Sequence, residues 1–264
     1  MKLNLIKHEM LQNRRGWFIG ALVIVGFLAL LSSFADLYID NEEMTKVIES
    51  FPPALLEGFG IDPSAFGSFE GFLSGQPYTF FVLLLGVFGA IWASTAIAKE
   101  RDRETDEFLF SLPYSRASIY LSKAFAHWLQ VTAIYIVSAA VVVAIGFTAT
   151  EMSDPAAVLL ILTGGYLISL AFSGIGFAVT VLLRTERDAM TAGIGLVIVS
   201  FLLNMLAGMD ESIRWLSGLS LFQAYDSGAV ISDGALTWGG TATTVMIYII
   251  GLIIGLILLK RQDI

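Results

Sequence analysis

A serine and two histidines are the residue types in this chain that could form a hydrolytic site. Ser173 lies in a small-residue run at 171–176, and a membrane serine protease needs such a serine beside a histidine base deep among its helices. His8 and His127 are both predicted at one edge of the membrane, whereas Ser173 is predicted near its middle. The small residues here are therefore interpreted as sites of close helix packing: Ser169, Ser173, Gly174 and Ala178.

Other catalytic groups are scarce. The chain has no cysteine, which removes thiolate metal sites and cysteine nucleophiles, and its His, Asp and Glu residues show no metal-ligand spacing. No GxxxxGK[ST] phosphate loop occurs, so any ATP must be bound by another chain. The sequence predicts that the protein is not an enzyme and has no catalytic residue, metal site or cofactor of its own.

The composition indicates which elements position the remaining groups. Of 264 residues, 56% are apolar and only 14% are charged, whereas soluble domains have about 25% charged residues. Six charge-free apolar segments of at least 19 residues are each long enough to cross a bilayer: 17–35, 78–98, 124–149, 156–183, 189–207 and 239–259. We predict an all-α polytopic protein with one transmembrane domain over 1–264 and outer loops at 36–77 and 208–238. Asp154 and Pro155 predict a capped start for the fourth span.

The charges predict an orientation. The N-terminal segment, the loops after spans two and four, and the C-terminal tail contain 13 of the 15 lysines and arginines. By the positive-inside rule, both termini are cytoplasmic in a multi-pass protein of the plasma membrane. The opposite side has 14 of the 23 acidic residues, so the net charge of −8 is concentrated outside. The cytoplasmic face is then positive and suited to a lipid surface, and no nucleic-acid partner is predicted.

Within the six segments the one ionisable side chain is His127. Ion-coupled secondary transporters are expected to have buried carboxylates or paired broken helices, and neither is visible. His127 is interpreted as an interfacial or packing residue, beside Trp128 and Gln130.

The loop between spans two and three has a charged first half and an apolar second half. Arg103 and Glu107 are four residues apart and can pair on one helix. Phe108, Leu109 and Leu112 follow on one face of a short helix, which Pro113 ends before Ser115 caps the next one. Such a helix can lie on the membrane or dock into a groove of a partner protein, although a solvated linker can have the same spacing.

The segment KERDRETDEFLFSLPYSRASIYLSK resembles the signature loop of type-2 ABC-transporter permeases, which reads R/K-E-x-E-x-G-T-x-E-x-L-L-x-x-P-x-S-R with a lysine about seven residues on. One departure is Glu104, which stands where the pattern has glycine. The matching positions are Glu100, Glu104, Thr105, Glu107, Leu109, Leu112, Pro113, Ser115, Arg116 and Lys123.

The resemblance implies a mechanism. Two permeases, either two copies or this chain with a homologous permease, assemble with two cytoplasmic ATPase subunits that bind the ATP. The loop after span two forms a coupling helix that fits a cleft in the ATPase. On this basis Phe108, Leu109 and Leu112 form an apolar plug, and a polar rim surrounds it: Glu100, Arg101, Arg103, Glu104 and Glu107.

The N-terminal segment resembles the amphipathic interfacial helix of that family. Its apolar face is expected to hold Leu3, Ile6 and Met10, with Leu11 at its margin. Its basic side chains are expected to contact lipid headgroups at the membrane interface: Lys7, Arg14 and Arg15.

The outer loops are rich in apolar residues. Five phenylalanines in the first loop predict short helices packed on the membrane surface or a small cap, with substrate binding as an open alternative: Phe51, Phe59, Phe66, Phe69 and Phe72. The segment 209–238 is apolar enough to re-enter the outer leaflet, as its counterpart does in the resembled family. In the last span Gly251 and Gly255 form a GxxxG motif, which serves either a dimer contact or internal packing.

Three functions remain open from the sequence. The first is the membrane permease of an ATP-driven exporter of a hydrophobic, amphipathic or peptide-like substrate. The second is a non-transporting subunit of the same architecture that transmits ATPase motion to an outer partner. The third, disfavoured by the scarcity of buried charge, is a channel or secondary transporter.

Overall fold

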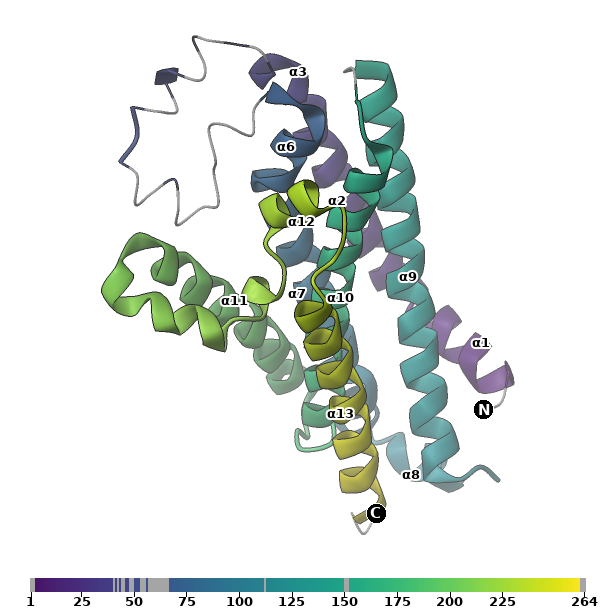
Figure 1. The fold of residues 1–264 in the computed structure, drawn as a ribbon. Helices are drawn as coiled ribbons and strands as arrows, with labels where there is room; N and C mark the ends of the chain where they lie inside the picture. The colour runs from purple at the N-terminus through teal and green to yellow at the C-terminus, as the bar shows by residue number, and fades with distance from the viewer. Residues whose placement is uncertain are drawn as a thin grey trace.

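The computed structural model describes residues 3–39, 67–111, 113–149 and 152–261, together with positions 41, 43, 46, 47, 50–52 and 56. Every regular element in these ranges is a helix, which confirms the predicted all-α fold (Figure 1). In chain order the elements are α1 (Leu3–Gln12), α2 (Arg14–Ser33), α3 (Ala35–Tyr38), α6 (Phe69–Ser74), α7 (Gln76–Asp102), α8 (Asp106–Ser111), α9 (Arg116–Ala149), α10 (Pro155–Val179), α11 (Glu186–Met209), η2 (Glu211–Leu219), η3 (Leu221–Ala224), α12 (Ser227–Asp233) and α13 (Trp238–Arg261).

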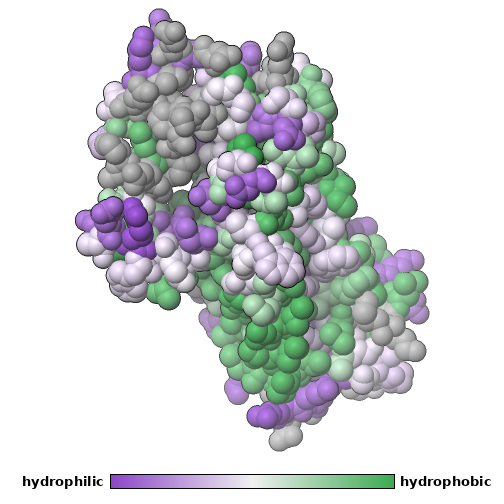
Figure 2. Space-filling model, viewed as in Figure 1, coloured by the Kyte–Doolittle hydropathy of each residue, from purple (hydrophilic) through white to green (hydrophobic). Residues whose placement is uncertain are grey.

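Within the described residues, six helices are long and apolar enough to cross a membrane, as predicted. They are Arg14–Tyr38, Gln76–Asp102, Arg116–Thr148, Pro155–Val179, Glu186–Met209 and Trp238–Arg261. The helices α1 and α8 and the end of α13 lie at one end of the bundle, here called the α8 end, and α3, α6 and α12 lie at the opposite α6 end (Figure 1). Apolar side chains cover the visible face around α13, and hydrophilic ones gather below it near the C-terminus (Figure 2).

The fourth span ends earlier than predicted. We expected it to continue to residue 183, but α10 ends at Val179. The hydroxyl of Thr180 accepts hydrogen bonds from two backbone N–H groups of α7, Ile97 at 2.9 Å and Ala98 at 3.2 Å. This attachment to α7 fixes the point where the chain turns towards α11.

Glycines bring α10 and α13 into close contact. A Cβ atom on Gly174 would stand 2.5 Å from the Cα of Tyr248, and a Cβ on Gly251 would overlap the backbone of Gly174. A Cβ on Gly255 would likewise overlap the hydroxyl of Tyr120. The GxxxG motif of α13 therefore serves packing inside this chain, where van der Waals contact drives helix association.

The serines of α10 and His127 are also packing residues. Ser169 and Ser173 are fully buried, and Ser173 donates its hydrogen bond to the carbonyl of Ser169 at 2.8 Å, within its own helix. The ring of His127 is buried, with Nε2 3.0 Å from the carbonyl oxygen of Gly89 and an edge-to-face contact with Phe177. The packing interpretation of both sites is confirmed, and the Ser173 hydroxyl is not bonded to a histidine.

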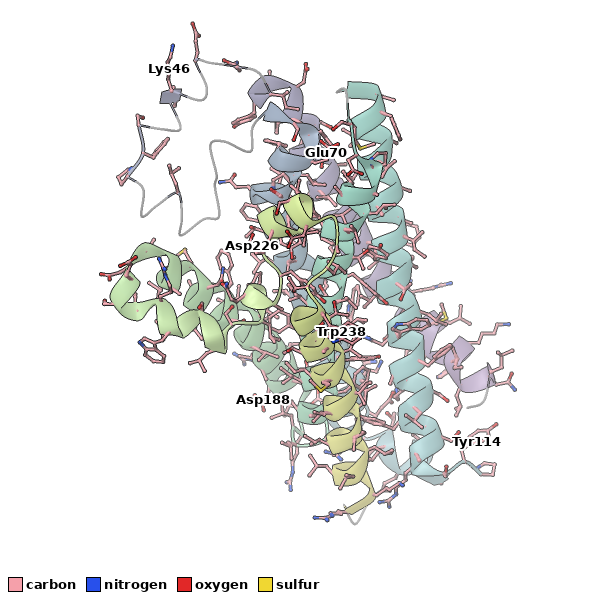
Figure 3. All side chains as sticks on the ribbon, in the orientation of Figure 1. Lys46, Glu70, Tyr114, Asp188, Asp226 and Trp238 are labelled. Atoms are coloured by element: carbon pink, nitrogen blue, oxygen red, sulfur yellow. The ribbon has the colours of Figure 1, made fainter. Side chains whose placement is uncertain are left out.

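At the α6 end, the short helix α6 is wholly buried. Its Glu70 side chain is only 2% exposed and lies beside the start of α10 (Figure 3). One carboxylate oxygen, Oε1, accepts hydrogen bonds from the backbone of Ser153 at 2.8 Å and of Asp154 at 2.5 Å. The other oxygen has no hydrogen-bond partner among the described residues. Asp154 in turn accepts from the amide of Ala156 at 2.9 Å, which confirms the predicted cap of α10.

Further short helices lie in the first outer loop and after α11. In the first outer loop, Phe69 and Phe72 are buried and Phe72 packs on Tyr38 of α3, with ring centres 5.3 Å apart. Phe59 and Phe66 lie outside the described residues. After α11, η2 folds back against that helix and leaves Trp215 exposed.

Candidate functional site

Four charged side chains are buried together where α1, the end of α7 and the start of α9 meet. The Glu9 carboxylate of α1 accepts hydrogen bonds from two ammonium groups, with Lys99 Nζ 2.7 Å from Oε1 and Lys123 Nζ 2.6 Å from Oε2. Lys123 also lies 2.9 Å from Oε1 of Glu100. Asn13 accepts a further hydrogen bond from Lys99 at 2.9 Å. We call Glu9, Lys99, Glu100 and Lys123 the Glu9 cluster.

Burial makes the Glu9 cluster dependent on pairing. Each of its four side chains is less than one tenth exposed. Taking one ion out of water carries a free-energy penalty of several kcal/mol, so a charge at such a site needs close partners. Two carboxylates face two ammonium groups, and their formal charges cancel. The cluster therefore joins three separate chain segments, since moving any one of them away would leave an unpaired buried charge.

The pKa of Glu9 reflects this balance. Burial alone would raise the pKa of its carboxyl group, because the charged form loses its hydration. The attraction of Lys123 and Lys99, with their hydrogen bonds, outweighs burial and lowers the pKa to about 2. Glu9 is consequently ionised at any pH that a cell maintains.

The chain leaves α7 through a tight turn. The amide of Thr105 donates to the carbonyl of Glu100 at 2.8 Å, and its hydroxyl donates to the Glu100 carboxylate, also at 2.8 Å. Between these residues Glu104 has φ of +54°, in the left-handed region that favours glycine. The structure thus explains why the resembled pattern has glycine here. The turn separates α7 from α8. Glu100, which belongs to the Glu9 cluster, therefore also holds the start of the loop.

Two arginines attach the same end of α7 to the turn between α10 and α11. Arg101 donates to the carbonyl of Val181 at 2.7 Å. Arg103 lies 3.1 Å from the carboxylate of Glu186 at the start of α11. The expected pair between Arg103 and Glu107 on one helix is wrong, because α7 ends at Asp102 before the turn. With the Glu9 cluster, these contacts connect the end of α7 to α1, α9, α10 and α11.

The architecture and this loop can be compared with known families. The model of one family, ABC-2 family transporter protein, matches residues 3–264. The chain belongs to the ABC-2 transporter family. A comparison with curated proteins finds no match. The resemblance drawn from the loop is confirmed. The chain is a multi-pass membrane permease of an ABC transporter, and permeases of this family work with an ATPase subunit.

The loop residues of this ABC-2 permease differ in what they contact. Glu100 is buried and Arg101 is partly buried, and both bind other parts of the same chain. By contrast, the side chains of Arg103, Glu104 and Glu107 are exposed. The apolar Leu109 is partly buried in α8. Leu112 and the side chain of Phe108 lie outside the described part of the chain. After the loop, Ser115 caps α9 as predicted, accepting from the amide of Ser118 at 3.2 Å.

The apolar face expected on α1 is divided in the structure. Ile6 is buried against the bundle next to Glu9, whereas Leu3 is 81% exposed and Leu11 is also exposed. The face towards the protein therefore combines an apolar and an acidic residue, three positions apart on one side of the helix. The three basic residues expected at the membrane interface are exposed: Lys7, Arg14 and Arg15.

Sequence reasoning missed Glu9. A first signal is the position of Glu9 three residues after Ile6, on a side of the helix that also carries an apolar residue. A second signal is that Lys99 and Lys123 flank apolar spans and need compensation if the helices continue past them.

Proposed function

We propose that this permease is the membrane subunit of an ATP-driven exporter, that its α8 end is cytoplasmic, and that a separate ATPase subunit docks on the loop 99–116. The observation that supports this proposal is the set of attachments at the end of α7. A load applied to α8 reaches α1 and α9 through the Glu9 cluster, and reaches α10 and α11 through Arg101 and Arg103. The loop can thereby move several spans together.

The structure divides the proposed docking residues into two groups. Glu104 and Glu107 are exposed and suited to the polar rim, around an apolar plug from Phe108, Leu109 and Leu112. Glu100 and Arg101 act indirectly in this proposal, because their contacts hold the loop in place. Such a division explains how a short helix can press on a partner without detaching from its own bundle.

We further propose that two permeases act together in the plasma membrane, as two copies or as this chain with a homologue. The GxxxG motif of α13 is occupied by α10, so this pairing uses other surfaces. ATP is bound and hydrolysed by the partner subunit, and the permease supplies no cofactor or catalytic residue. Apart from the Glu9 cluster and Glu70, no lysine, arginine, aspartate or glutamate is buried among the described residues, and a bundle of this kind suits a hydrophobic, amphipathic or peptide-like substrate.

The docking proposal is tested by Phe108→Asp combined with Leu109→Asp. We expect the ATPase subunit to be lost from the complex purified in mild detergent, while the permease remains inserted and folded. Leu182→Asp is the matched control, since Leu182 is an exposed leucine of the neighbouring turn between α10 and α11. An ATPase that stays bound to the double variant as it does to wild type would refute docking on α8.

Orientation has its own test. The chain has no cysteine, so single cysteines can be introduced at Glu43 and Glu107 and labelled in intact cells with a reagent that does not cross membranes. We expect labelling at Glu43 alone. Labelling at Glu107 alone would reverse the proposed sidedness.

A further inference from the structure

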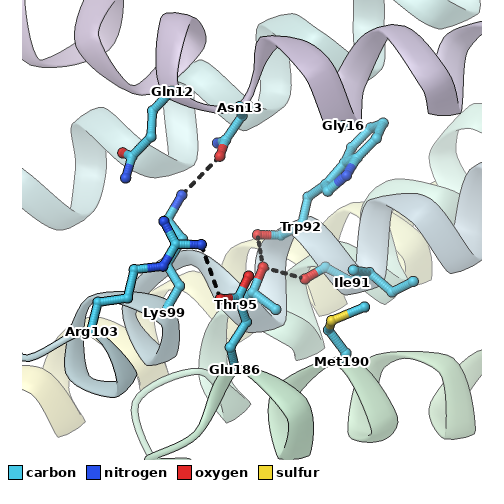
Figure 4. A pocket seen from close by; sticks show the side chains of 10 residues that line it. All are labelled: Gln12, Asn13, Gly16, Ile91, Trp92, Thr95, Lys99, Arg103, Glu186 and Met190. Atoms are coloured by element: carbon cyan, nitrogen blue, oxygen red, sulfur yellow. Dashed lines mark hydrogen bonds and ion pairs between the residues drawn. The ribbon is translucent and has the colours of Figure 1, made fainter.

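A cavity of about 240 Å³ opens beside the Glu9 cluster, and Lys99 of that cluster lines it (Figure 4). The corner between α1 and α2, the last turns of α7 and the start of α11 form its walls. The proposed docking helix α8 contributes none of the residues that line it. It is therefore a separate feature of the α8 end.

The cavity has an apolar wall and a polar wall. Ile91 and Met190 lie at one side together with the open backbone of Gly16. Lys99 and Arg103 lie at the other. Such a lining suits an amphipathic ligand, with a polar group at the charged wall and hydrocarbon at the other.

The polar wall has hydrogen-bond donors that the chain itself does not use. An ammonium group has three N–H donors, and Lys99 uses two of them, for Glu9 and Asn13. The side-chain amide of Gln12 and the indole N–H of Trp92 make no hydrogen bond within the described part of the chain. These unused N–H donors line one small space and favour a ligand rich in acceptor oxygens.

Arg103 can join these donors at little cost. Its ion pair with Glu186 is at the mouth of the cavity, and the two side chains are 53% and 33% exposed. Exposed pairs of this kind contribute little to stability, so Arg103 can turn from Glu186 to a ligand. A guanidinium group also matches two oxygens of a phosphate in a bidentate arrangement.

The position of the cavity identifies the source of such a phosphate. It lies at one end of the spanning helices, where lipid headgroups meet the bundle, and Trp92 is an interfacial type of residue. We infer that the cavity binds the phosphate group of a phospholipid from the leaflet on the α8 side. The phosphate lies against Lys99, Arg103 and Gln12, and the glycerol and first chain carbons lie against Ile91 and Met190. This inference does not depend on ATPase docking.

Binding can be measured by native mass spectrometry of the purified full-length permease in detergent. The probe is a short-chain phosphatidylglycerol, compared with a phosphate-free galactolipid of equal chain length and with inorganic phosphate alone. We expect saturable binding of the phospholipid. The galactolipid should bind at least about tenfold more weakly, because it lacks the charge-assisted hydrogen bond of the phosphate. Inorganic phosphate should also bind weakly, because it makes no contact with the apolar wall.

Two pairs of variants locate the site. Gly16→Phe adds a side chain at the cavity wall. Gly26→Phe is its control and adds the same side chain elsewhere on α2. At either position an added Cβ meets no neighbouring atom. Arg103→Gln removes the proposed phosphate ligand, and Arg187→Gln removes an exposed arginine that does not line the cavity. We expect about tenfold weaker phospholipid binding for Gly16→Phe and Arg103→Gln, and unchanged binding for the two controls.

Three results would overturn the inference. If all four variants bind phospholipid as wild type does, the cavity is not the site. If the galactolipid binds as tightly as the phospholipid, the phosphate is not recognised. If inorganic phosphate alone binds tightly and is lost in Arg103→Gln, the source is free phosphate and not a lipid.

Discussion

The two ends of the bundle bury carboxylates in different ways. At the α8 end, Glu9 and Glu100 each lie against at least one ammonium group, and the resulting ion pairs connect α1, α7 and α9. At the α6 end, Glu70 is buried with no lysine or arginine bonded to it among the described residues, and it relies on backbone N–H groups at the start of α10.

The difference bears on how each end can move. In the Glu9 cluster every charge depends on a partner from another segment, so separating one segment exposes two unmatched ions. Glu70 contacts one neighbouring turn, and its release breaks a few hydrogen bonds to amides that water can replace. We therefore expect the α8 end to move as a unit and the α6 end to open locally, which agrees with the proposed docking of an ATPase at the α8 end.

The strongest test of this comparison removes one member of the Glu9 cluster. Glu9→Leu leaves two buried lysines with one carboxylate, and we expect the free energy of unfolding to fall by about 3–5 kcal/mol. Removing Lys99 as well, with Glu9→Leu and Lys99→Met, leaves the matched pair of Lys123 and Glu100 and should restore most of the loss. Denaturant unfolding in detergent measures both. A double variant less stable than Glu9→Leu would contradict pairing as the main effect.

Acid should weaken the α8 end through Glu9. Its pKa is about 2 in the folded protein against an ordinary value of 4.5, so its ionised form stabilises the fold above pH 4.5. That contribution is lost as the pH falls from 4.5 through 2, up to about 3 kcal/mol. The free energies of unfolding of wild type and of Glu9→Gln should therefore differ most near neutral pH and become similar in acid. A difference that grows on acidification would contradict this sign.

At the α6 end, Glu70→Ala should have a smaller effect. It leaves the amides of Ser153 and Asp154 without their acceptor, and we expect a loss of about 1–3 kcal/mol in the free energy of unfolding. Glu70→Gln retains an acceptor oxygen and should lose less. If Glu70→Ala costs more than Glu9→Leu, the contrast between the two ends is wrong.

The smallest expected effect concerns the turn after α7. Glu104→Gly relieves the left-handed backbone at φ +54° and should stabilise the permease by about 0.5–1 kcal/mol. Glu107→Gly, within α8, should instead destabilise it by about 0.5–1 kcal/mol. The two melting temperatures in detergent should shift in opposite directions. Equal shifts of one sign would show that the backbone at Glu104 is not under strain.

Much of the fold could be predicted from the sequence. The predictable features depend on composition and local chemistry, which can be read from one segment of the chain at a time. They are the six apolar segments, the small residues of α10 and the Asp154 cap. The span ends were less accurate, because a charge-free segment cannot extend back past Lys123, although α9 begins at Arg116 and includes that lysine.

The candidate site was only half predictable. Its loop was found because spacing and local turn chemistry identify it. The Glu9 cluster could not be predicted, because Glu9 is separated in the sequence from Lys99 by 90 positions and from Lys123 by 114. Helical periodicity shows which side a residue occupies, but which helix packs on that side is a property of the tertiary structure. Arg103 illustrates the same limit, because its partner is Glu186 and not the nearer Glu107.

The long separation within the Glu9 cluster has a consequence for biosynthesis. Proteins are made from the N-terminus, so α1 leaves the ribosome long before Lys99 and Lys123 exist. Glu9 has no counter-ion until the end of the second span supplies Lys99, and its second partner, Lys123, is made only at the start of the third span. The first helix to be synthesised therefore completes its ion pairs only when the third span begins, and its docking marks the assembly of the first three spans.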